Sequence, residues 1–201
     1  LGQSSSVVAL RGDRAVVVSL GGYDTAAAQQ LLHRHHVSRV ELLCLPLRGP
    51  EARQAAGNIL ARCPVEALAL PAGAYQGKDL TALLEDRTVL ALEEGESLSL
   101  LDGGMTLTAR AAMTRLELTI AGNTVVLETG TESLGGRAGL LITGCQDTAV
   151  ISSLSLLQER AIMEEHWETL PAGDYIAPEG REILVDFFSD GTTRVRGKTD
   201  A

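Results

Sequence analysis

Short apolar strands alternate with helical segments through the first third of the chain, and this order constrains the fold more than any other feature. Strands are predicted at residues 15–20, 40–45 and 65–70, and helices at 26–36 and 50–62. Neighbouring parallel strands need a crossover of about a dozen residues or more, usually a helix. The alternation therefore predicts parallel strands joined by crossover helices.

A hairpin precedes this unit, and a run of strands follows it. Residues 6–10 are separated from the next strand by a polar turn containing Gly12, which predicts an antiparallel pair. A short helix is expected near 78–84, and the middle of the chain then reads as antiparallel, with Gly122-Asn123 linking its last two strands. The strand candidates of this middle part are residues 88–92, 97–101, 105–111, 115–121 and 124–128.

The last third returns to a mixed pattern. Buried strands are predicted at 140–143 and 150–152, and a helix at 155–167. A closing hairpin is predicted from residues 182–188 and 193–196. Because no linker, low-complexity segment or fixed-period repeat interrupts the chain, we expect residues 1–201 to form a single domain.

Composition limits the classes of function. The net charge of -9 disfavours direct nucleic-acid binding and contact with anionic lipid, since like charges repel. No apolar run approaches the roughly 18 residues of a membrane span, which predicts a soluble domain without direct membrane insertion.

The chain begins at Leu1 without a secretory signal and reads as a fragment of a larger protein. Cys44, Cys63 and Cys145 form no metal or disulfide pattern and are predicted to be buried and inert.

The beginning of the chain resembles a known family. The segment Leu1-Gly2-Gln3-Ser4-Ser5-Ser6, followed by Val16-Val17-Val18-Ser19-Leu20-Gly21-Gly22, looks like the start of the metallo-β-lactamase domain of ComEC-type competence proteins, which reads V-G-Q-G-D-S and then L-I-D-x-G. The resemblance implies an α/β (α+β) fold, a four-layer αββα metallo-β-lactamase-like sandwich with mixed sheets. In active family members it also implies a two-metal hydrolase or nuclease on the soluble part of a DNA-uptake channel.

The metal-binding residues of that family are replaced in this chain. The ligand positions of the family's T-H-x-H-x-D-H motif align, within about one residue, with Pro46, Arg48, Pro50 and Glu51. The Asp of the family's L-I-D-x-G strand aligns with Ser19. The bridging Asp of the family's T-G-D turn aligns with Thr131. Proline has no donor atom and a guanidinium does not bind cations, so one carboxylate remains. These six residues define a vestigial pocket, and we predict no catalytic residue, no metal ligand and no cofactor.

Other polar clusters are interpreted as ordinary surface. His33 and His36 share a face near a helix end, where cationic side chains favour the helix dipole, and no carboxylate or cysteine lies at a suitable offset. The carboxylates Glu93, Glu94 and Glu96 are typical of a solvated turn.

The leading hypothesis is a catalytically inactive, metallo-β-lactamase-like domain that serves as a structural or interaction module of a ComEC-like membrane DNA-uptake protein. Its partners would be other parts of that protein, and the domain would be attached to a bacterial cell membrane on a side that the sequence does not define. One alternative is a nuclease or phosphodiesterase in which Asp24, Glu51 or nearby polar groups rebuild an atypical or reduced metal site, or a metal-free one. Another is a ligand-binding module with a cavity around Ser19, Pro46 and Thr131.

Overall fold

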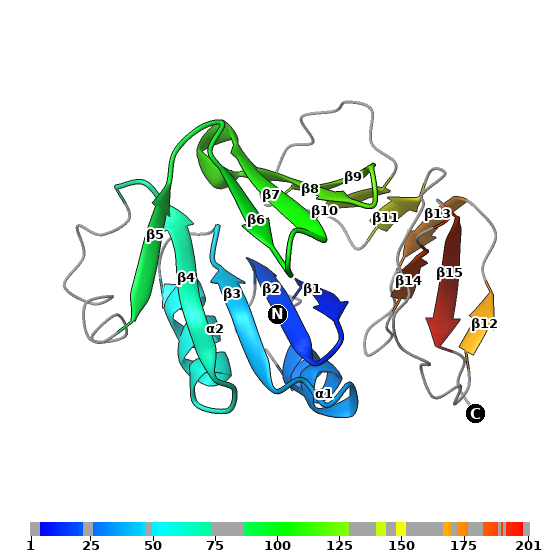
Figure 1. Ribbon diagram of the computed structural model, residues 1–201, viewed down its shortest axis with the longest axis horizontal. Coiled ribbons are helices and arrows are strands. Elements are labelled where there is room, and N and C mark those ends of the chain that lie inside the picture. The colour runs from blue at the N-terminus through cyan, green and yellow to red at the C-terminus, as the bar shows by residue number, and fades with distance from the viewer. Residues whose placement is uncertain are drawn as a thin grey trace.

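The structure, a computed structural model, contains three β-sheets and two α-helices in the part of the chain that it describes (Figure 1). The described residues are 5–21, 26–46, 50–73, 87–128, 140–143, 148–151, 167–169, 173–176, 183–188, 190 and 192–198. The predicted short helix near 78–84 lies outside them.

The first sheet has the strand order β1-β2-β3-β4-β5. Its strands are β1 (Ser5–Arg11), β2 (Arg14–Gly21), β3 (Arg39–Cys44), β4 (Val65–Pro71) and β5 (Thr88–Leu92). The pair β1–β2 is antiparallel, and β2, β3, β4 and β5 run parallel. The crossover helices α1 (Ala26–Arg34) and α2 (Pro50–Leu60) follow β2 and β3. The predicted hairpin and parallel unit are therefore confirmed.

The second sheet has the order β13-β11-β10-β9-β8-β7-β6, and a third sheet has the order β12-β15-β14. The strands of the second sheet are β6 (Ser97–Leu100), β7 (Met105–Arg110), β8 (Arg115–Ile120), β9 (Asn123–Glu128), β10 (Leu140–Thr143), β11 (Thr148–Ile151) and β13 (Gly173–Ile176). The third sheet contains β12 (Trp167–Thr169), β14 (Ile183–Phe187) and β15 (Thr193–Lys198). A short 3-10 turn, η2 (Ala111–Met113), connects β7 to β8.

Two apolar clusters lie on opposite faces of the first sheet. Alternate residues of β2 divide between them, as the period of a strand requires: Val16 and Val18 join one cluster, and Ala15 and Val17 the other. The first cluster joins the first sheet to Leu107 and other residues of the second sheet. The second packs the opposite face against residues of α1 and α2. The described residues thus form a helical layer, a sheet and a second sheet.

Burial along β9 differs from burial across the rest of the second sheet. Val125 and Leu127 belong to the cluster between the sheets, yet Val126 and Glu128, on the opposite face of the same strand, are also buried. By contrast, Ser97 and Thr119 are exposed. Both faces of β9 are therefore covered. A four-layer sandwich requires such burial at its central strands, although no helix covers this face within the described residues.

Three sequence predictions need correction. The strand at 88–92 is not part of an antiparallel middle, because β5 extends the first sheet parallel to β4. The turn between β8 and β9 is Ala121-Gly122, with φ angles of 49° and 80°, since a two-residue turn of this hand needs positive φ at both positions. Trp167 is not helical but pairs with Lys198, because strand pairing in the third sheet overrides the local helical pattern. Residues 155–166 of that predicted helix lie outside the described part.

Candidate functional site

The carboxyl-terminal edge of the first sheet carries the described part of the vestigial pocket. Val18 and Cys44 are partners in the parallel pair β2–β3, so the residues that follow them, Ser19 and Leu45-Pro46, lie at the same edge. Ser19 is 5% exposed, and Pro46 is buried.

The other four residues of the vestigial pocket are described only in part. Pro50 and Glu51 are the first residues of α2, and only their backbone is described. Arg48 and Thr131 lie outside the described residues. The structure thus places Ser19 and Pro46 at the same edge of the sheet, and the predicted ligand cavity around Ser19, Pro46 and Thr131 stays a prediction.

The cysteines differ in environment. Cys44 is fully buried between the two sheets, and burial raises the pKa of its thiol to about 12. Its predicted burial is confirmed, and the raised pKa disfavours the reactive thiolate. Cys63 is only partly buried at the surface, so its predicted full burial is wrong, although desolvation raises the pKa of this thiol as well. Cys145 lies outside the described residues.

An ion-pair bridge links the first sheet to the turn between β6 and β7. Arg11 donates to the carbonyl oxygen of Leu101 at 2.6 Å, and the Glu41 carboxylate accepts from the Leu101 amide at 3.1 Å. Arg14 pairs with Glu41 at 3.6 Å and also with Asp102. Leu101 and Asp102 have φ angles of 53° and 52°, an unfavourable conformation for residues with side chains. The bridge holds this strained turn against the first sheet, which is a structural role.

A second charged cluster is buried in the third sheet. The Asp186 carboxylate accepts from Arg196 at 3.0 and 3.1 Å and from Arg194 at 3.1 Å. Asp186 is 5% exposed and Arg196 3%. Their strands are anchored in the core, because Val195 belongs to the cluster between the first and second sheets and Val185 packs against it. The Asp186 carboxylate thus ties β14 to β15, which is a structural role.

The histidine and carboxylate groups do not assemble into a metal centre within the described part of the chain. No group of three or more His, Cys, Asp or Glu side chains gathers among those residues. His33 and His36 are exposed, in agreement with the predicted solvated helix face. Glu94 and Glu96 accept hydrogen bonds from Ala112 N and Glu93 N, as in an ordinary charged turn.

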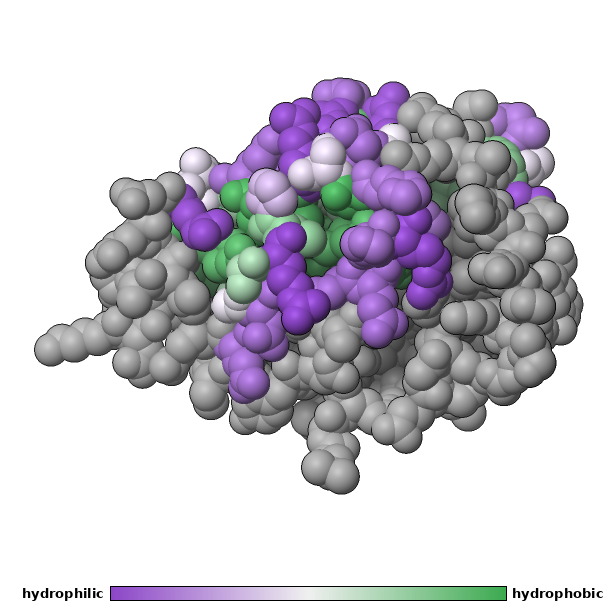
Figure 2. Space-filling model, turned by 90° about the horizontal axis from the view of Figure 1, so that it is seen from below, coloured by the Kyte–Doolittle hydropathy of each residue, from purple (hydrophilic) through white to green (hydrophobic). Residues whose placement is uncertain are grey.

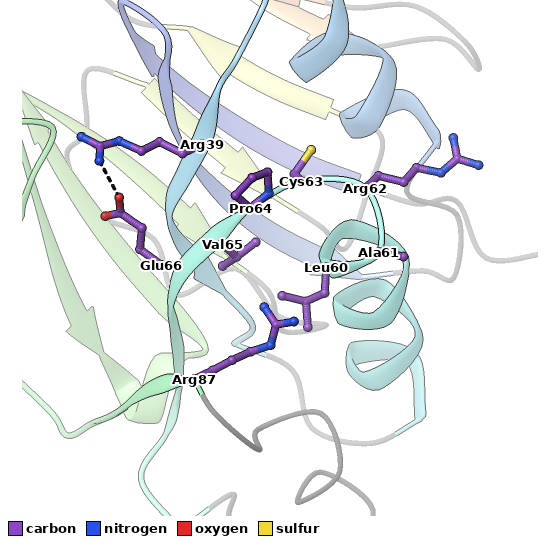
Figure 3. A pocket seen from close by; sticks show the side chains of 9 residues that line it. All are labelled: Arg39, Leu60, Ala61, Arg62, Cys63, Pro64, Val65, Glu66 and Arg87. Carbon is purple, nitrogen blue, oxygen red and sulfur yellow. Dashed lines mark ion pairs between the residues drawn. The ribbon is translucent and has the colours of Figure 1, made fainter.

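A pocket of about 500 Å³ opens at the opposite, amino-terminal edge of the first sheet (Figure 3). Figure 2 views the molecule from below, the side where α2 ends and β4 begins, and shows apolar surface framed by hydrophilic side chains. The pocket is lined by Arg39, Leu60, Ala61, Arg62, Cys63, Pro64, Val65, Glu66 and Arg87. The pocket lies at the amino ends of the parallel strands, and Ser19 and Pro46 lie at their carboxyl ends. It is therefore distinct from the vestigial pocket.

Sequence reasoning missed this pocket, although a signal for it exists. Arg39 begins β3, Arg62 precedes β4 by three residues, and Arg87 immediately precedes β5. The amino ends of parallel strands meet at one edge of a sheet, so arginines placed before successive strands must gather there. An arginine before a single strand is also typical of ordinary surface, so the signal appears only when the three strand starts are considered together.

Comparison with known proteins gives partial likenesses in structure. No family model matches the sequence, and no curated protein matches it significantly. The structure of Zn²⁺-bound PqqB from Methylobacterium extorquens matches 62% of this chain and 48% of its own, with a TM-score of 0.47 and 12% identity. The peroxy diiron species of the chemotaxis sensor ODP matches 63% of this chain and 55% of its own, with a TM-score of 0.46 and 11% identity.

Both neighbours are metallo-β-lactamase-fold proteins. The chain spans about half the length of each. At these TM-scores and identities, the likeness decides neither the fold family nor the activity of this chain.

Proposed function

We propose that this chain is a metallo-β-lactamase-like domain that has no metal-dependent hydrolytic activity and acts as a structural or interaction module. The observation that carries the proposal is the chemistry of the carboxyl-terminal edge of the first sheet. There, where the resemblance implies metal ligands, Ser19 offers a buried neutral hydroxyl and Pro46 offers no donor atom. A metal pair needs several imidazole and carboxylate donors converging on one point.

The remaining positions of the motif support the same conclusion by their residue types. Arg48 is a permanent cation, Pro50 has no side-chain donor, and Thr131 is neutral. Glu51 alone provides a carboxylate. This donor set does not fit a metal pair, and we derive no reaction step through one.

The proposed context is a ComEC-like membrane DNA-uptake protein, in which this domain would contact other parts of the same protein. The support is the order of strands and helices and the Gly2-Gln3 resemblance at the start of the chain. In the part of the chain that the structure describes, no helix has both the length and the apolar character of a membrane span. The context is tested by the full reading frame: several hydrophobic spans beside this domain would support it, and a frame without them would remove it.

The inactivity is tested by nuclease and phosphodiesterase assays with added Mn²⁺ or Zn²⁺. We expect no turnover above the protein-free blank. Turnover that is abolished by Glu51→Ala, but retained in the matched control Glu93→Ala at an exposed turn, would contradict the proposal and favour a hydrolase with a reduced metal site.

A further inference from the structure

We propose that the pocket between the end of α2 and the start of β5 binds a small organic anion, with Arg87 as its anchoring cation. The pocket is an open notch of about 500 Å³, which gives room for a small molecule that stays partly exposed to water. This binding site lies at the opposite edge of the sheet from the vestigial pocket and does not depend on the proposed function.

The shape of the pocket follows from the register of three strands. The β3–β4 ladder already includes Val65, whereas the β4–β5 ladder begins two residues later, at the Ala67–Thr88 pair. The first two residues of β4 therefore have no neighbour in β5. The end of α2 lies on the other side of this gap, so the pocket is a notch in the edge of the sheet (Figure 3).

The charge of the pocket is opposite to that of the chain. Three arginines and one glutamate line it, a local balance of +2 in a protein with a net charge of -9. Arg39 is paired with Glu66 at 2.9 Å, so its charge is already balanced. Arg62 and Arg87 are exposed and make no ion pair within the described residues. Arg87 therefore brings one uncompensated guanidinium group into the pocket and Arg62 a second one at its rim, and both favour an anion.

The side chains define the kind of anion. Figure 3 shows Arg87 directed toward Leu60 and Val65, Arg39 turned toward Glu66, and Arg62 extending away at the rim. An anionic group bound by Arg87 would therefore have its apolar part against Leu60 and Val65. A guanidinium matches the planar, paired oxygens of a carboxylate or phosphate, so a phosphate ester or carboxylate with an apolar body fits best.

The carboxyl end of α2 does not oppose this ligand strongly, because some of its final carbonyl groups are already hydrogen-bonded. Gly57 O accepts from Ala61 N at 3.0 Å, and Ile59 O accepts from both Arg62 N and Cys63 N at 3.0 Å. These bonds satisfy carbonyls that would otherwise repel an anion at a helix end.

The test is a titration of the whole chain with phenyl phosphate, followed by the amide resonances of the protein at physiological ionic strength. We expect saturable shifts centred on Cys63, Val65 and Arg87. Arg87→Gln should weaken binding about tenfold, the loss of one charge-assisted hydrogen bond. Glu66→Gln should tighten binding, since it removes a negative charge and releases Arg39.

Two controls distinguish this site from nonspecific attraction. Arg34→Gln makes the same charge change at the exposed end of α1, and it should leave the affinity unchanged. Inorganic phosphate lacks the apolar body of the proposed ligand, and benzyl alcohol lacks its anionic group. Both should therefore bind more weakly than phenyl phosphate.

Three results would overturn the proposal. They are the absence of saturable shifts, equal effects of Arg87→Gln and Arg34→Gln, and inorganic phosphate binding as tightly as phenyl phosphate. Unchanged thermal melting of each variant would show that it is folded, so that a loss of binding reports on the pocket.

Discussion

Removal of the Asp186 carboxylate tests how the third sheet is held. In Asp186→Ala, the guanidinium of Arg196, a residue that is 3% exposed in the native structure, loses its contacts at 3.0 and 3.1 Å. Breaking a buried ion pair from one side costs about 3–5 kcal/mol, because the remaining charge has neither water nor a partner. Arg194 is 36% exposed, so Arg194→Gln should cost less than about 1 kcal/mol. Replacing both buried partners, as in Asp186→Leu with Arg196→Met, should restore most of the stability.

The assay is urea unfolding followed by two signals. Trp167 is the single tryptophan and lies in β12, beside the strand that carries Arg196, so its fluorescence reports on the third sheet. Far-ultraviolet circular dichroism reports on the whole chain. Since Val195, Val185 and Phe187 pack into the cluster between the two large sheets, the two transitions should coincide.

Two outcomes would refute this reasoning. A cost below about 1 kcal/mol for Asp186→Ala would mean that the pair is not buried in solution. A fluorescence transition at lower urea than the circular dichroism transition would mean that the third sheet unfolds by itself, which would contradict the single domain expected for residues 1–201.

Further predictions concern burial and charge at single residues. Alkylation at pH 8 followed by peptide mapping should label Cys63 faster than Cys44, which should react only at the rate of global unfolding. Equal labelling would contradict the burial that raises the pKa of Cys44 to about 12. Glu41→Ala should destabilise the fold by about 2 kcal/mol in urea unfolding, because a turn amide and an arginine lose a charged acceptor, and a neutral effect would refute the bridging role. Hydrogen bonds from Thr192 lower the pKa of the Asp190 carboxyl in the folded protein. Their contribution to folding stability is therefore present above the carboxyl's pKa in the unfolded chain and is lost as pH falls through its pKa in the folded protein. Thr192→Ala should raise the pKa of Asp190 in an NMR titration, and an unchanged pKa would contradict this.

The order of strands and helices was predictable because each element carries its own local signal. The hairpin turn at Gly12, the helix start at Pro50 and the apolar strand 40–45 each restrict the backbone locally, and all three predictions are confirmed. The assignment of β5 to the first sheet was not predictable from local pattern, because a short apolar strand pairs equally well in either sheet. Its place is decided by register with Ala67 and the residues that follow.

The candidate sites were only partly predictable from the sequence. Ser19 and Pro46 were grouped by the family resemblance, and the pair β2–β3 places them at the same edge of the sheet. Arg39 and Arg87 lie at the opposite edge, but they were missed because an arginine before a strand is also an ordinary surface residue. The left-handed conformations of Leu101 and Asp102 had no sequence signal, since the contacts that stabilise them come from Arg11 and Glu41, far away in the chain.

We infer that the carboxyl-terminal edge of the first sheet lacks the groups that would hold two metal ions. Calorimetric titration of the whole chain with Zn²⁺ and with Mn²⁺ tests this inference. We expect no stoichiometric tight binding of either ion, and any weak heat of binding should be the same in Glu51→Ala. Saturable binding of two ions per chain, weakened by Glu51→Ala, would contradict it.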